Sequence, residues 1–115
     1  MDHPSTCPRS PNTNELRLLR ELVKRSTNVT LEQGWEKTLL VEPMNDGGMG
    51  SLKLTPPLAT EYRKFGGLVS RLDFQDRDGV DVSVVLNVDQ NGHLFELDVW
   101  KTDFSPLLEI PKHFH

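Results

Sequence analysis

The chain has 115 residues, of which 36% are hydrophobic and 26% charged. This composition suffices for one domain with a core and excludes a disordered chain. Lysine and arginine total 13 against 17 aspartates and glutamates, a formal net charge of −4, so nucleic acid is not an expected partner. The apolar runs are too short for a transmembrane helix, so no membrane partner is expected either.

The two ends of the chain favour tails around a single domain. Residues 1–11 contain three prolines and no apolar run of a secretory signal. The single cysteine, Cys7, excludes an internal disulfide and is compatible with a reducing compartment, so we expect a cytoplasmic location. We predict a flexible tail over residues 1–12, a single domain over 13–111 and a C-terminal tail over 112–115.

An amphipathic helix is predicted at the start of the domain. Leucines at positions 16, 19 and 22 recur at helical spacing, while charged residues form the opposite face. The segment 12–14 offers N-cap residues, and the segment 26–30 ends the helix. A short helical turn is expected within residues 31–37.

From residue 38 the apolar residues recur with the period of two that is typical of strands. Segments 39–44 and 50–54 form a predicted hairpin around the turn at 45–48. Pro43 indicates that the first of these strands lies at a sheet edge. Residues 58–65 fit either a helical turn or a loop.

Three further strands, at 68–74, 80–88 and 94–100, are separated by short polar turns and predict an antiparallel meander. Its apolar face needs a cover, and the predicted helix is the only good candidate. We therefore expect an α+β domain, an N-terminal amphipathic helix packed on an antiparallel sheet of about five strands ending in a meander. The following side chains are expected in the core: Leu19, Leu22, Val82, Val84, Leu97 and Val99. By alternation, Leu68 and Phe95 are expected to point to the same inner face.

Two segments resemble a family of small bacterial domains of unknown function. They read Asp46-Gly47-Gly48-Met49-Gly50-Ser51 and, over residues 95–107, FELDVWKTDFSPL. The resemblance extends over about residues 16–111 and implies a compact bacterial cytoplasmic domain, with no catalytic residue to carry over. In size and acidity the chain is also similar to immunity proteins that neutralise bacterial toxins, an analogy without a shared motif.

The acidic residues are concentrated in one part of the chain. Residues 73–103 contain eight acidic and two basic residues, a net charge of −6. If the strands alternate regularly, four acids and one tryptophan share the outer face of the sheet. These predicted partner-binding residues are Asp73, Asp81, Glu96, Asp98 and Trp100. Such a face suits a protein partner with a basic surface. Alternatively it is a solvated face, with Trp100 covered by the segment around Phe104 and Leu107.

Other functions stay open. Glu96 and Asp98 could act as a carboxylate pair in a small enzyme or metal-binding domain, or form an ion pair with Arg71 or Lys101. A homo-oligomeric structural domain is a further alternative. The acidic turns at 76–81 and 89–92 have hairpin composition and lack the closing Glu of a calcium loop. We therefore expect no metal, no cofactor and no catalytic residue.

Overall fold

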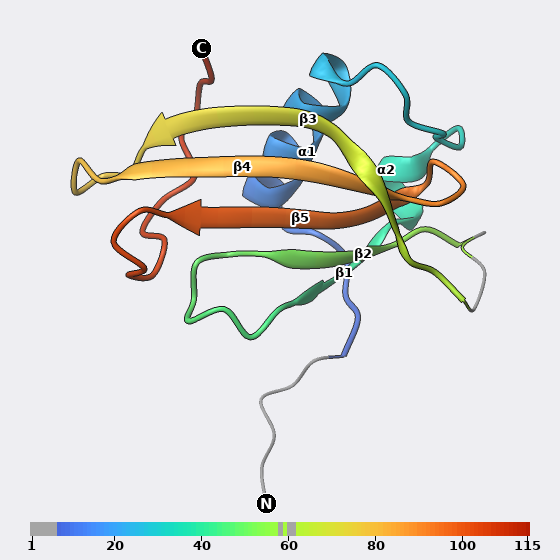
Figure 1. The fold of residues 1–115 in the computed structure, drawn as a ribbon, viewed down its shortest axis with the longest axis horizontal. Coiled ribbons are helices and arrows are strands. Elements are labelled where there is room, and N and C mark those ends of the chain that lie inside the picture. Colours follow the sequence, from blue (N-terminus) through green and yellow to red (C-terminus); the bar gives the residue numbers. More distant parts are fainter. Residues whose placement is uncertain (1–6, 58, 60–61) are drawn as a thin grey trace, which may run out of the picture.

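The computed structural model in Figure 1 describes residues 7–57, 59 and 62–115 and has the predicted α+β fold. One long helix packs behind a five-stranded antiparallel sheet of order β1-β2-β5-β4-β3, in which the last three strands form the expected meander. The predicted segment 58–65 lies partly outside the described residues, as do residues 1–6 of the predicted tail. The elements are α1 (Thr13–Arg25), α2 (Trp35–Thr38), β1 (Leu40–Pro43), β2 (Leu52–Thr55), β3 (Phe65–Gln75), β4 (Asp81–Asp89) and β5 (Leu94–Lys101).

Helix α1 begins where a capping box satisfies its first backbone donors. The Asn12 side chain accepts a hydrogen bond from the backbone N–H of Glu15 at 2.8 Å, and the Glu15 carboxylate accepts one from the backbone N–H of Asn12 at 2.9 Å. Arg9 adds two hydrogen bonds to the same carboxylate, at 2.8 and 2.9 Å. The start of the helix is therefore fixed by residues on both sides of its N-cap.

Parts of both predicted tails contact the domain. The backbone of Arg9 donates to and accepts from that of Val41, at 2.9 and 2.7 Å, so the chain joins the edge of β1. At the other end, the carbonyl of His115 accepts a hydrogen bond from Arg25, and Phe114 packs against the core.

Within α1, α2 and the rest of the described chain, no helix is long and apolar enough to cross a bilayer.

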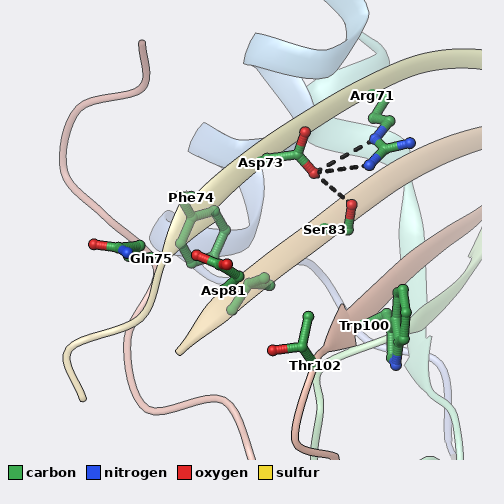
Figure 2. A pocket seen from close by; sticks show the side chains of 9 residues that line it. Arg71, Asp73, Phe74, Gln75, Asp81, Ser83, Trp100 and Thr102 are labelled. Carbon is green, nitrogen blue, oxygen red and sulfur yellow. Dashed lines mark hydrogen bonds and ion pairs between the residues drawn. The ribbon is translucent and has the colours of Figure 1, made fainter. Parts of the chain in front are cut away.

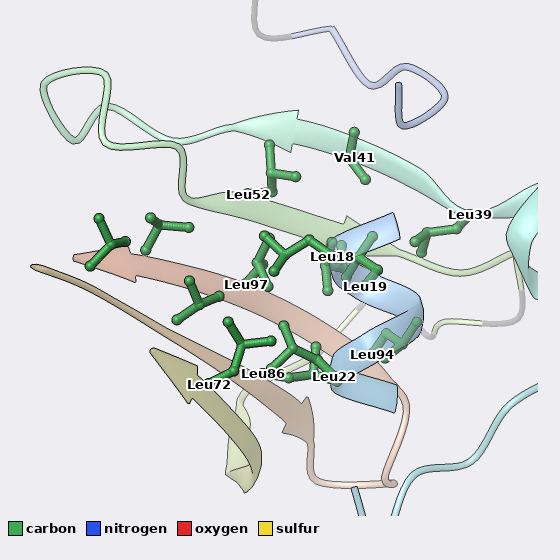
Figure 3. Packing of buried hydrophobic residues seen from close by; sticks show 14 residues of the cluster. Leu18, Leu19, Leu22, Leu39, Val41, Leu52, Leu72, Leu86, Leu94 and Leu97 are labelled. Carbon is green, nitrogen blue, oxygen red and sulfur yellow. The ribbon is translucent and has the colours of Figure 1, made fainter. Parts of the chain in front are cut away.

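The core lies between α1 and the inner face of the sheet (Figure 3). Helix α1 contributes Leu18, Leu19 and Leu22, all fully shielded from solvent. Every strand of the sheet contributes at least one further buried side chain. The predicted core residues that the structure confirms as buried are Leu19, Leu22, Val82, Val84, Leu97 and Val99.

Register shifts reverse the predicted orientation of a few side chains. Leu68 pairs with Asn87, which points outward, and Leu68 is 55% exposed, so its expected inward orientation was wrong. The same kind of shift in β5 buries Leu94 and leaves Phe95 partly exposed, the opposite of the predicted order. A β-bulge adds one residue to one strand of a pair, and strict alternation cannot anticipate it.

The two segments that carried the family resemblance contact each other. The carbonyl of Gly48 accepts a hydrogen bond from the backbone N–H of Leu107 at 3.0 Å. The Ser51 hydroxyl accepts one from the backbone N–H of Val99 at 2.9 Å. The turn between β1 and β2 therefore packs on β5 and on the chain that follows it. This contact gives both segments a structural role.

Candidate functional site

The face of the sheet opposite α1 carries the candidate site. The outward side chains of β3, β4 and β5 form this surface, called here the outer face, and no other described element packs over it (Figure 1). Strand register brings all five predicted partner-binding residues together on it. Asp73 and Trp100 both pair with Ser83, while Asp98 and Glu96 pair with Val85 and Asn87. Of the five, Asp73, Asp81 and Trp100 are exposed, whereas Glu96 and Asp98 are partly buried.

A groove of about 470 Å³ crosses one end of the outer face (Figure 2). It exists because short side chains lie between long ones: Ser83 lies between Asp73 and Trp100, and Thr102 borders Asp81. Neither Glu96 nor Asp98 lines it. The lining residues are Arg71, Asp73, Phe74, Gln75, Asp81, Val82, Ser83, Trp100 and Thr102.

The two carboxylates of the groove differ in their surroundings. Asp73 accepts a hydrogen bond from the Ser83 hydroxyl and two weaker ones from Arg71, at 3.3 and 3.4 Å. The Ser83 hydroxyl, followed by the Arg71 guanidinium, lowers the pKa of Asp73 despite some desolvation. In contrast, the Asp81 carboxylate has no side-chain partner among the described residues. Asp81 is therefore the carboxylate left for an incoming group.

Trp100 presents a large apolar surface beside this groove. It is 51% exposed, and its ring centroid lies 6.3 Å from that of Phe104, which is 67% exposed. Leu107, the other residue expected to cover Trp100, packs instead against the core. The predicted cover is therefore wrong for Leu107 and incomplete for Phe104.

Several acids of the negatively charged segment do not belong to the outer face. The Lys101 ammonium is buried and lies 2.8 Å from a carboxylate oxygen of each of Asp76 and Asp78. Asp89 is also buried and pairs with Arg63 at 2.9 Å. Sequence reasoning missed both ion pairs, although the period of two already placed Lys101 on the same side as Leu97 and Val99.

The partners predicted for Glu96 and Asp98 are different in the structure. Arg71 pairs with Asp73, and Lys101 turns to the opposite face, so the predicted ion pair from either to Glu96 or Asp98 was wrong. Asp98 instead accepts a hydrogen bond from the Asn87 amide at 3.0 Å. Across residues 7–57, 59 and 62–115, no group of three or more His, Cys, Asp or Glu side chains could hold a metal ion.

Comparison with known proteins gives one match. The model of a family described as a domain of unknown function (DUF6984) matches residues 8–111, which is most of the chain. No curated protein and no solved structure matches it.

Proposed function

Since this chain belongs to the DUF6984 family of domains of unknown function, we propose from its own geometry that it is a small acidic protein-binding domain. The outer face is its contact surface, and the partner carries a basic surface. Asp73, Asp81, Glu96, Asp98 and Trp100 are the contact residues.

The half-exposed Trp100 beside the groove is the observation that supports this proposal most directly. Tryptophan is enriched among the residues that contribute most to binding energy, because its large rigid surface is fully desolvated in a complex. Here the neighbouring Phe104 enlarges the apolar area. A sheet face that contacts only water gains nothing from two exposed aromatic rings.

The charges around Trp100 supply the second part of the argument. The acids of the outer face carry more negative charge than Arg71 offsets, and like charges on one face repel each other modestly. A basic partner relieves this repulsion and associates faster at low salt. The binding surface therefore combines an apolar contact with electrostatic steering.

In its most specific form, the proposal is an immunity protein of the bacterial cytoplasm that neutralises a toxin. The small size, the net charge of −4 and the acidic outer face support this reading. A toxin gene next to the gene for this chain would favour it over other protein partners.

The proposal is tested by reversing charges on the outer face. The variant Asp81→Lys plus Asp98→Lys and the wild type are each used to capture partners from the native host. Each captured protein is identified and purified, and its Kd is measured at low and high salt. The expected result is a salt-sensitive complex that the variant does not form.

A matched control makes this test specific. Glu32→Lys plus Glu109→Lys produces the same change in net charge with residues outside the outer face. This control variant retains the partner if the proposal is right. Equal loss of binding in both variants, with both still folded, would show that only net charge matters and would contradict the proposed surface.

The two alternative functions, a homo-oligomer and a metal-binding or enzymatic domain, are each tested by a separate measurement. A homo-oligomer sediments faster than a 115-residue monomer and dissociates on dilution. A metal-binding or enzymatic domain that uses Glu96 and Asp98 melts at a higher temperature with divalent cations, because a ligand that binds only the folded form stabilises it.

A further inference from the structure

We propose that the groove on the outer face receives the guanidinium group of an arginine side chain of the partner. This inference rests on the proposed protein-binding function and names the group that the site recognises. It is carried by the groove and by the half-exposed Trp100 on its wall, and the unpartnered Asp81 completes it.

Trp100 provides a surface on which a planar cation stacks. A guanidinium over the face of a tryptophan is attracted by the ring quadrupole, and tryptophan is the strongest aromatic partner for such a contact. The indole is accessible, since half of its surface meets solvent and the neighbouring Phe104 ring is tilted by 51° to it and not stacked on its face. The chain itself contains a similar pair, because the Arg63 guanidinium lies 5.1 Å from the ring centroid of Phe95.

Asp81 provides the charge that fixes the cation in the groove. It is exposed, lies on the groove wall and has no side-chain partner among the described residues. An arginine forms two parallel hydrogen bonds with a carboxylate, a geometry that lysine cannot reproduce. The hydroxyls of Ser83 and Thr102 line the same groove and can accept the remaining N–H groups.

The charged side chains that line the groove have a net charge of about −1, which one bound cation neutralises. Asp73 and Asp81 contribute two negative charges and Arg71 one positive charge. Arg71 is occupied by Asp73, so its repulsion of an incoming guanidinium is offset by that carboxylate. The groove volume of about 470 Å³ lies within the 300–1,000 Å³ range usual for small-ligand sites, which is roomy for one side chain.

The test measures binding of short peptides through the fluorescence of Trp100. The full chain carries Trp35→Phe, so that Trp100 is its single tryptophan, and circular dichroism verifies its fold. Three acetylated and amidated peptides are titrated, with arginine, lysine or citrulline between two glycines. Citrulline keeps the shape of arginine and lacks its charge. The arginine peptide is expected to change the Trp100 emission saturably, the lysine peptide several-fold more weakly, and the citrulline peptide not at all.

Variants then locate the site. Asp81→Asn removes a charge-assisted hydrogen bond and is expected to weaken arginine-peptide binding about 10-fold. Glu42→Gln removes one negative charge from β1, outside the groove and outside the proposed contact residues, and is expected to change the affinity by less than about 2-fold, since charges at a distance are largely screened.

The outcomes separate this inference from the proposed function. Equal affinities for the arginine and lysine peptides, or equal effects of Asp81→Asn and Glu42→Gln, would overturn the arginine site and leave an acidic protein-binding face. No response to any peptide would also overturn the arginine site. The proposed function would then still be decided by the charge-reversal experiment with the whole partner.

Discussion

The ammonium of Lys101 and the carboxylate of Asp76 lie 2.8 Å apart, and neither side chain has any solvent-exposed surface. Lys101 ends β5, and Asp76 begins the turn between β3 and β4. The same carboxylate accepts hydrogen bonds from the backbone N–H groups of Leu108 and Glu109, at 2.8 and 3.1 Å. This ion pair therefore connects the turn, the last strand and the C-terminal segment.

Replacing Lys101 with methionine is expected to destabilise the fold strongly, because Asp76 is left buried without its cation. Lys53→Met removes the same charge from an exposed position of β2 and should change stability little. Urea unfolding of the two variants checks this difference. Similar stabilities for both variants would show that the buried pair contributes no more than a surface charge.

Asp76 also predicts how stability depends on acid. Burial alone raises its pKa, but hydrogen bonds from Lys101 and from the backbone N–H groups of Leu108, Arg77 and Glu109 outweigh burial and lower the pKa to about 2. A pKa below the unfolded value of 3.8 adds stability above about pH 4 that disappears as the pH falls towards 2. The free energy of unfolding, measured with urea between pH 2 and pH 5, should show this loss. In Asp76→Asn the free energy of unfolding should change less steeply with pH. An unchanged slope would exclude Asp76 as a cause.

Truncating Leu97 tests the core. Its side chain is 1% exposed in the central part of the sheet, and Leu97→Ala should lower the free energy of unfolding by about 2–5 kcal/mol. Leu68→Ala is the control, since this side chain is 55% exposed and its loss should change stability by less than about 0.5 kcal/mol. The reverse order of the two effects would contradict the observed register.

The glycine turn between β1 and β2 gives a fourth prediction. Gly47 and Gly48 have φ values of 74° and 83°, so alanine at either position is strained and should cost about 1–2 kcal/mol. A Cβ on Gly48 would also lie 3.3 Å from Pro106, whereas nothing lies within 4 Å at Gly47. Gly48→Ala should therefore be the more destabilising of the two in thermal melting. Equal effects would show that Pro106 moves aside freely.

Metal removal is expected to leave stability unchanged. The acids of the turn at 76–79 resemble calcium ligands, but they already contact the Lys101 ammonium. This ammonium balances their negative charge in place of a metal ion. The melting temperature should be the same with and without a chelator. A sharp decrease on chelation would overturn this expectation and favour the metal-binding alternative.

Local sequence patterns were sufficient for much of this architecture. The spacing of leucines predicted α1, and the residues at 12–14 predicted its capped start, because both depend on contacts within one or two helical turns. Pro43 predicted the edge position of β1, since proline cannot donate to a neighbouring strand. Alternation also brought Asp73, Asp81 and Trp100 to one face, because side chains two residues apart on a strand share a side.

The tertiary structure alone decided where this alternation fails and which charges pair. The bulges beside Leu68 and Phe95 depend on how two strands align, which the pattern of either strand does not contain. The partners of Lys101 come from a turn more than 20 residues away, and their choice depends on which groups are buried together. The groove between Asp81 and Trp100 likewise requires three adjacent strands in register, because it is the short side chain of Ser83 between its longer neighbours that leaves the space.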